Sequence, residues 1–161
     1  MKVTLYPSRI LFREAKPVFE FGDALKKLAG DMAQTMKEYD GVGLAGPQAN
    51  QDAKIIIVHT PEGDHTFVNP QIIQKSRETA EEEEGCLSLP GLFVNVKRAE
   101  EVEVACQTLE GETVKLKVSG LTSRIFQHEI DHVEGRLIIH RTPFLKRMRL
   151  RKKLREIANL S

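Results

Sequence analysis

Residues 127–132 read Gln127-His128-Glu129-Ile130-Asp131-His132. The two histidines are four positions apart, and in an α-helix this spacing brings both imidazoles to one face, within reach of a single metal ion. Glu129 directly follows the first histidine, so its carboxylate would lie beside a water on the ion instead of binding the ion. A motif this short also arises by chance from surface histidines, so the rest of the sequence has to decide between the two interpretations.

The residues around this motif predict the helix that carries it. Apolar and motif positions that fall near one another on a helical wheel are Leu121, Ile125, Phe126, Glu129 and His132. We therefore expect a helix from Leu121 to about Val133.

Two more helices are predicted nearer the ends of the chain. Residues 23–39 carry apolar side chains at spacings of three and four, which is typical of an amphipathic helix, and Asp23 lies near its N-terminus. The last helix is expected to begin with Thr142 as N-cap and Pro143 in its first turn. Its apolar stripe consists of Leu150, Leu154, Ile157 and Ala158.

Short strands are predicted between residues 53 and 118. Residues 55–58 form the continuous apolar run of a buried strand, whereas residues 102–104 and 114–118 alternate apolar and polar side chains. We expect these strands to pair antiparallel. The chain has no repeat, low-complexity linker or break in composition, so residues 1–161 are predicted to form a single domain.

Composition and charge narrow the class of protein. With 40% hydrophobic and 29% charged residues, the chain has the composition of a soluble globular protein, and no apolar run approaches the roughly 18 residues of a membrane-spanning helix. The first residues lack the apolar stretch of a signal peptide, so we expect a cytoplasmic protein.

The charge is divided unevenly along the chain. Residues 141–161 hold eight basic residues and one acidic residue, Glu156, for a net charge of +7, which leaves −6 for the rest of a chain whose total is +1. A basic end of this kind favours a polyanionic partner, and the alternative is a solvated face that has no partner.

A hydrolytic metal site normally has three protein ligands and one position open to water, so a third ligand is expected. Downstream, the extended zinc-peptidase pattern requires a histidine where this chain has Ile138. Glu134 is too close along the helix and would point away from the ion, and His140 has no motif to recommend it. The downstream residues therefore offer no third ligand.

The two cysteines are candidates of unequal quality. Cys86 lies 42 residues before His128, beside Gly85, which permits close approach of the backbone. We predict Cys86 as the third ligand, and the alternative is a buried structural cysteine. For Cys106, which alternates within a strand-like stretch, the structural alternative is favoured. A disulfide between them is not expected in a reducing cytosol.

Three motifs in sequence order resemble those of the peptide deformylases. They are Gly41-Val42-Gly43-Leu44-Ala45-Gly46-Pro47-Gln48, Glu84-Gly85-Cys86-Leu87-Ser88 and His128-Glu129-Ile130-Asp131-His132. The resemblance implies an α+β fold in which antiparallel β-sheets surround a central metal-binding helix, with an N-terminal and a C-terminal helix. It also implies a metal-dependent hydrolase that removes the N-formyl group from the formyl-methionine of newly synthesised proteins and releases formate.

Catalytic roles are expected for three residues. Glu129 would act as general base on the water and then deliver the proton to the leaving amine. The resemblance implies that the side-chain amide of Gln48 and the backbone N–H of Leu87 stabilise the oxyanion. Glu84 and Arg98 resemble a family pair that braces the loop bearing Cys86, whereas residues 81–84 otherwise read as a solvated acidic face.

Substrate contacts are predicted for five further residues. Gly43 and Gly85 would let an extended peptide lie close to the backbone and pair with it in the manner of a β-strand. Candidates for the apolar pocket that receives the methionine side chain are Val42, Leu121 and Ile125. The alternative for these three is ordinary core packing.

The implied cofactor is one divalent metal ion per chain. Sulfur with two imidazole nitrogens suits zinc and iron(II), and the resemblance implies Fe2+, with Zn2+, Ni2+ or Co2+ able to occupy the site. The implied partners are N-formyl-methionyl nascent peptides and, through the basic residues 146–158, the ribosome. Neither DNA nor a membrane is expected as a partner.

Three residues depart from the family pattern, and two rival functions remain open. Ser8, Gly46 and His140 replace the commoner family residues, and Gly46 would add backbone freedom to the loop carrying Gln48. One rival is a metallopeptidase that cleaves internal bonds, which the residue at Ile138 argues against. The other is an RNA-binding module with a structural metal, which would usually have four protein ligands.

Overall fold

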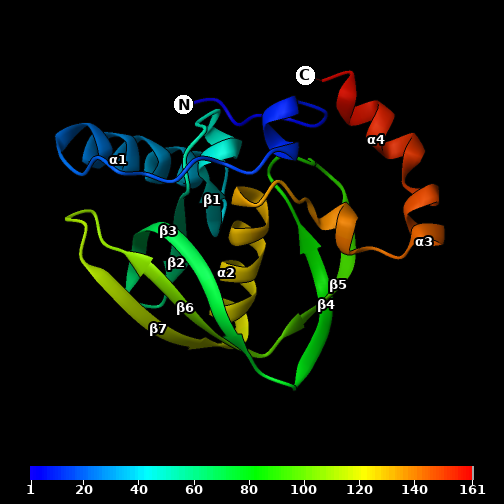
Figure 1. Cartoon of the computed structure of the whole chain (residues 1–161). Coiled ribbons are helices and arrows are strands. Elements are labelled where there is room, and N and C mark those ends of the chain that lie inside the picture. Colours follow the sequence, from blue (N-terminus) through cyan, green and yellow to red (C-terminus); the bar gives the residue numbers. More distant parts are fainter. Residues whose placement is uncertain (161) are drawn as a thin grey trace.

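In the computed structural model, which describes residues 1–160, helix α2 (Gly120–Val133) runs between two antiparallel sheets (Figure 1). Every residue from Ser123 to Val133 is buried, so this part of the helix has no solvent-facing side. The helix predicted from Leu121 to about Val133 is therefore confirmed. Its polar residues must find partners inside the protein, because buried polar groups without hydrogen bonds are costly.

The larger sheet has five strands in the order β1-β2-β3-β6-β7, and every neighbouring pair is antiparallel. The strands are β1 (Gly43–Ala45), β2 (Ile55–Thr60), β3 (Gly63–Lys75), β6 (Glu101–Gln107) and β7 (Thr113–Ser119). The predicted strands at residues 55–58, 102–104 and 114–118 lie within β2, β6 and β7, so the antiparallel expectation is confirmed.

The smaller sheet consists of β4 (Thr79–Gly85) and β5 (Phe93–Ala99), which pair antiparallel. It lies on the other side of α2 from the larger sheet (Figure 1). Residues 81–84 are part of β4, and their expected role as a solvated face holds only for the first three, because Glu84 is 6% exposed.

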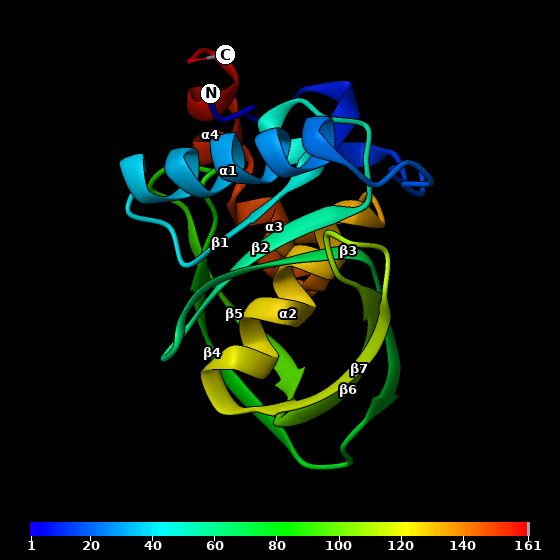
Figure 2. The same ribbon diagram turned by 90° about the vertical axis from the view of Figure 1, so that its left-hand side faces the viewer.

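Strand β2 explains why its sequence is apolar without a break. Ile56 and Val58 pack in the cluster that includes Phe126 and Ile130 of α2, whereas Ile55 and Ile57 pack in the cluster under α1 (Asp23–Glu38). Figure 2 shows α1 and α2 on opposite sides of this part of the sheet. Because successive side chains of a strand point to opposite faces, both faces of β2 have to be apolar.

Helix α1 confirms the amphipathic helix predicted at residues 23–39. Its buried apolar side chains are those of Leu25, Ala29, Met32 and Met36, at the expected spacings. Two short 3-10 helices, η1 (Arg9–Phe12) and η2 (Gly46–Ala49), flank this helix in the sequence. Residue Gln48 lies in η2.

The C-terminal end corrects one boundary. Two short helices, α3 (Phe144–Arg149) and α4 (Arg151–Ala158), replace the single helix predicted from Thr142, and the 3-10 helix η3 (Ile138–Arg141) precedes them. Thr142 is not an N-cap, because its hydroxyl donates to the Ile138 carbonyl and closes η3, while Pro143 caps α3. α3 has no buried side chain, whereas Ile138 and Ile139 of η3 and Leu154 and Ile157 of α4 are buried, so packing of η3 and α4 holds this end of the chain in place.

The third apolar cluster joins this end of the chain to the smaller sheet. Leu154 and Ile157 pack there with Leu89, Val94 and Val96. None of the helices in residues 1–160 combines the length and the apolar character needed to cross a lipid bilayer.

Candidate metal centre

Three side chains that donate electron pairs meet beside α2. The ligand atoms of Cys86, His128 and His132 all lie within 4.8 Å of one another. Cys86 Sγ is 3.2 Å from His132 Nε2, and the two Nε2 atoms are 3.3 Å apart. The histidines lie one turn apart on α2, and the cysteine comes from the loop that follows β4.

The protonation of this cluster supports a bound cation. His128 Nδ1 lies 3.0 Å from Glu84 Oε2, and an ionised carboxylate can only accept, so Nδ1 carries the proton. Burial lowers the pKa of His128, but Cys86 and Glu84 outweigh that effect and raise it well above its usual value, so without a metal the ring also holds a proton on Nε2. A cation would take the place of that proton and bind the Nε2 lone pair, which points toward His132 Nε2. Three electron-pair donors converging on one point need a shared positive charge, and one sulfur with two nitrogens is a donor set that suits a divalent transition metal.

The local charges favour the thiolate form of Cys86. Burial raises the pKa of the thiol, but the neighbouring His132 and His128 outweigh that effect and lower it to about 5. The thiolate is the form that binds metals. Cys106 contrasts with it, since burial raises the pKa of that thiol to about 11. Cys106 packs in the apolar cluster around Phe126, which confirms the structural interpretation.

Glu129 is buried next to the three ligand atoms, and one oxygen of its carboxylate has no hydrogen-bond partner in residues 1–160. Within the described residues 1–160, its Oε2 has no hydrogen-bond partner, and neither has His132 Nδ1. Burial raises the pKa of Glu129 to about 7. A carboxylate in this state is suited to taking up and releasing a proton near neutral pH.

Glycine at position 43 is required by this carboxylate. A Cβ atom at Gly43 would lie 2.3 Å from Glu129 Oε1, so any side chain there would displace the carboxylate. The sequence suggested Gly43 only as a position where a peptide approaches. The structure gives it a second reason, which spacing along the chain did not reveal.

The side-chain amide of Gln48 is held in one orientation. The backbone N–H of Ala45 donates to Gln48 Oε1 at 2.8 Å, which turns Nε2 toward Cys86 Sγ at 3.6 Å. Gln48 is 1% exposed. The amide nitrogen of Gln48 is therefore directed at the cluster of Cys86, His128 and His132 through its contact with the sulfur.

The backbone N–H of Leu87 is also available. No carbonyl or side chain in the described part of the chain accepts a hydrogen bond from it. Leu87 follows Cys86 directly, so its N–H lies at the edge of the same cluster. This is the arrangement that an oxyanion donor requires.

A cavity of about 490 Å³ opens onto this cluster. Its walls include the predicted substrate residues Gly43, Gly85, Val42, Leu121 and Ile125. Core packing does not account for Val42 and Leu121, which are 50% and 66% exposed. Ile125 is different, because it also belongs to the apolar cluster around Phe126.

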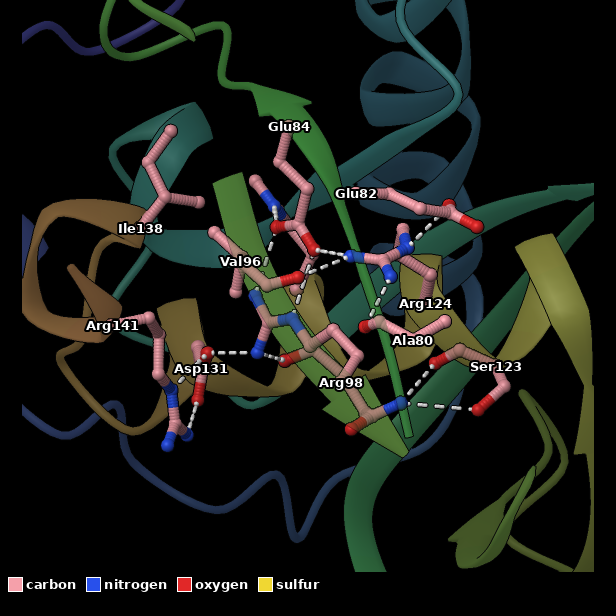
Figure 3. A network of polar contacts seen from close by, with 12 residues as sticks. Ala80, Glu82, Glu84, Val96, Arg98, Ser123, Arg124, Asp131, Ile138 and Arg141 are labelled. Carbon is pink, nitrogen blue, oxygen red and sulfur yellow. Dashed lines mark hydrogen bonds and ion pairs between the residues drawn. The ribbon is translucent and has the colours of Figure 1, made fainter. Parts of the chain in front are cut away.

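A buried network of charges surrounds Glu84, the carboxylate that contacts His128; Figure 3 shows Glu84 with Arg98 and Arg124. Arg98 donates to both oxygens of Glu84, at 2.9 and 3.0 Å, as the predicted bracing pair requires. Burial raises the pKa of the Glu84 carboxyl, but His128 and Arg98 outweigh it and lower the pKa to about 2. Glu84 therefore remains ionised and accepts from His128 Nδ1, which is the support that a metal-binding histidine usually has.

Arg124 is a member of this network that sequence reasoning missed. Its Nη1 donates to Glu84 Oε1 at 2.7 Å, and Figure 3 shows it approaching the carboxylate alongside Arg98. A signal was present in the sequence, because Arg124 lies four residues before His128 and so on the same helix face.

Two departures from the family pattern have local explanations. A Cβ at Gly46 would lie 2.3 Å from the Ala53 carbonyl oxygen, so the commoner alanine does not fit this backbone. Gly46 therefore allows tight packing of the loop carrying Gln48, rather than the loosening expected from glycine. His140 Nδ1 accepts from the Leu137 N–H at 3.0 Å and closes η3. Nothing in the structure explains Ser8.

Comparison with known proteins gives the family. The family model for polypeptide deformylase matches residues 1–148. A peptide deformylase of Thermotoga neapolitana is 42% identical over 157 residues, covering 98% of this chain and 96% of that protein. One from Dictyoglomus thermophilum is 45% identical over 132 residues, covering 82% and 86% respectively.

Solved structures agree with the sequence matches. A peptide deformylase from Plasmodium falciparum has a TM-score of 0.93 and 34% identity, covering 98% of this chain and 95% of that one. The Thermotoga maritima enzyme has a TM-score of 0.86 and 39% identity, covering 88% and 97%. With the same three motifs gathered around one cavity, the chain belongs to the polypeptide deformylase family.

Proposed function

We propose that this metal-dependent deformylase removes the formyl group of nascent polypeptides with Glu129 as its proton-transfer residue. The observation that carries the proposal is the position of the Glu129 carboxylate, which is buried, has a free oxygen and adjoins the Cys86, His128 and His132 cluster. The rest of the reaction is assigned from the side chains around it.

The three clustered side chains are the proposed ligands. A divalent ion held by Cys86, His128 and His132 would act as a Lewis acid and bring the pKa of a water toward neutrality. Glu84 would keep His128 in the tautomer that directs Nε2 to the ion. We further propose Fe2+ as the working ion, with Zn2+, Ni2+ or Co2+ as substitutes, and metal analysis of anaerobically purified protein would test this choice.

Proton transfer falls to Glu129. Its carboxylate accepts a proton from the attacking water and delivers it to the amine that leaves as the formyl carbon–nitrogen bond breaks. Burial favours both halves of this cycle, since it holds the pKa of Glu129 near 7, between those of a free carboxylic acid and an amine.

Two donors stabilise the negative charge on the formyl oxygen. The Nε2 of Gln48 is fixed by the contact between Oε1 and Ala45, and the Leu87 N–H is free of protein acceptors in residues 1–160. Donors that are oriented in advance stabilise a transition state without rearranging during the reaction.

The cavity is the proposed site for the peptide. Gly43 and Gly85 line this cavity, where an extended peptide would pair with their backbone, and Val42, Leu121 and Ile125 form an apolar wall for the methionine side chain. Val42 and Leu121 are exposed, which supports a role in contact with a ligand.

The wider setting follows from the substrate. We expect the protein to work in the cytoplasm on emerging chains, with residues 1–161 acting as one catalytic domain. The basic residues 146–158 are proposed to bind phosphate-rich RNA of the ribosome, because most of their charged side chains are exposed on α3 and α4.

The decisive assay measures formate release from a formyl-methionyl peptide, with the unformylated peptide as the matched control. We expect formate from the first and no change in the second, and metal content measured in the same samples should be one ion per chain. Cleavage of an internal peptide bond without formate release would refute the assignment and favour a metallopeptidase.

A further inference from the structure

We propose that Arg124 is a positioning residue that holds the Glu84 carboxylate against His128 and so sets the orientation of this metal ligand. The proposal rests on the proposed function, since it takes His128 to be a ligand. Among the described residues, Arg124 makes no hydrogen bond or ion pair with a proposed ligand. Its nitrogens contact oxygens of Ala80, Glu82, Glu84 and Val96, all labelled in Figure 3.

All three nitrogens of the Arg124 guanidinium are occupied. Nη1 donates to Glu84 Oε1 at 2.7 Å and to the Val96 carbonyl at 3.0 Å, and Nη2 donates to the Ala80 carbonyl at 3.0 Å. Nε lies 2.9 Å from Glu82 Oε2. One side chain of α2 thus binds both strands of the smaller sheet, and its planar group is fixed in rotation.

Glu84 receives donors from three directions. Its Oε1 accepts from Arg98 Nε and Arg124 Nη1, and its Oε2 accepts from Arg98 Nη2 and His128 Nδ1. Four donors match the roughly four acceptor positions of a carboxylate. Arg98 is itself anchored to α2, because its Nη1 donates to Asp131 Oδ2 at 2.5 Å. Arg124 adds a second, independent donor to Oε1, which further restricts rotation of the Glu84 carboxylate about the bidentate pair.

The helix connects Arg124 to the ligand it positions. Arg124 and His128 are four residues apart on α2, so they lie on one face, one turn from each other. They bind opposite oxygens of the same carboxylate, Oε1 and Oε2 respectively. Glu84 is therefore held between two groups on one rigid element, and the direction of His128 Nε2 depends on both.

The remaining contacts of Arg124 allow a matched control. The side chain of Glu82 is 60% exposed, whereas that of Glu84 is 5% exposed, although both carboxylates bind Arg124. Glu82 has no contact with a proposed ligand among the described residues. Glu82→Gln therefore weakens a contact of Arg124 to β4 without altering the Glu84–His128 pair.

The experiment uses the full chain loaded with Co2+, whose absorption spectrum reports thiolate binding and ligand geometry. Wild type, Arg124→Ala, Arg124→Lys and Glu82→Gln are compared by their Co2+ spectra, by the rate of Co2+ release to a chelator, and by the unfolding temperature of the metal-free protein. We expect release about tenfold faster in Arg124→Ala, in line with the loss of other supports of metal-binding histidines.

The conservative variant makes the test specific. Lysine retains the charge but has one nitrogen in place of three, so Arg124→Lys should release Co2+ at a rate between wild type and Arg124→Ala, with a shifted spectrum. Glu82→Gln should stay within twofold of wild type. If Arg124→Ala does not fold, Arg124→Lys against Glu82→Gln decides the matter alone.

Two results would overturn the proposal, and they are distinct from failure of the proposed function. The first is a wild-type spectrum and release rate in Arg124→Lys and Arg124→Ala while the metal-free unfolding temperature falls, which would make Arg124 a structural clamp. The second is equal acceleration in Glu82→Gln. A wild-type protein that binds no Co2+ through its thiolate would instead refute the ligand assignment itself.

Discussion

The metal centre and the basic segment at residues 146–158 are both rich in ionisable side chains, but they use them in opposite ways. At the centre, Glu84, Arg98 and Glu129 are at most 6% exposed, and the first two are bound to one another. In the basic segment most charged side chains face solvent, and few pair with an acid in residues 1–160. A buried charge requires a specific partner, so its position indicates a specific chemical role. An exposed charge is compatible with many binding partners or with none.

The two regions are nevertheless joined by packing. Leu154 and Ile157 of α4 lie in the third apolar cluster together with Leu89. The partly buried Cys86 packs against this same cluster. Deleting residues 146–161 would therefore remove two core side chains together with the basic charges. Point substitutions separate the two roles, and their expected effects differ in size.

The largest effect is expected at Glu129. Glu129→Ala should lower kcat for formate release by about a thousandfold, because Glu84, the other carboxylate that contacts a proposed ligand in residues 1–160, is already occupied by His128, Arg98 and Arg124. Metal content should remain near wild type, since Glu129 is not a proposed ligand. The isosteric Glu129→Gln serves as control for packing, and near-normal turnover in either variant would contradict the assigned role.

A smaller loss is expected when the oriented amide is removed. Gln48→Ala should lower kcat about a hundredfold, the lower end of what single oxyanion donors contribute. Gln51→Ala, in the loop after the same 3-10 helix and directed at the Ala49 carbonyl, is the matched control. Equal rates in the two variants would remove Gln48 from the mechanism.

Core packing of the basic segment is tested by Leu154→Ala. We expect the free energy of unfolding to fall by about 2 kcal/mol, because Leu154 is 8% exposed and packs in the third cluster. Denaturant titration measures the change, and Leu160→Ala, at a side chain 67% exposed, is the control. Below the unfolding transition, formate release should stay normal; a large loss of rate would show that the segment supports the site directly.

The smallest effect on turnover is expected from the exposed charges. Replacing Lys152 and Arg155 by glutamate should leave turnover of short peptides within twofold, since both side chains face solvent. Ribosome binding should weaken, and the slope of log affinity against log salt should fall by about one for each phosphate that the variant no longer binds. Binding that is unaffected by these changes, at every salt concentration, would refute the docking proposal.

The fold was predictable in segments whose apolar residues follow a single helical or strand periodicity. The helix at residues 23–39 and the helix beginning near Leu121 both ended within a residue or so of their predicted limits. The C-terminal helix was predicted as one element because Thr142 and Pro143 indicated its start and an apolar stripe follows from Leu150 to Ala158. It is two helices because α3 has no buried side chain to hold it in line with α4.

The site was predictable in part. Motif spacing located Cys86, His128, His132 and Glu129, which the fold brings together. The charge pattern of residues 81–84 gave no indication that Glu84 alone turns inward, and its pairing with Arg98 was expected only from the family resemblance. The inward position depends on pairing of β4 with β5 and on two arginines from separate elements.

The sequence by itself determined which chemistry is available: two histidines one helical turn apart, a carboxylate beside them and a thiol upstream, because local spacing is fixed by the geometry of a helix. Only the tertiary structure decided how these groups are held. The Gly43 contact with Glu129, the Ala45 contact with Gln48 and the Arg124 contact with Glu84 join residues of different elements. Such contacts depend on how the sheets and the helix pack against one another. Periodicity along the chain carries no information about the distance between side chains of different elements.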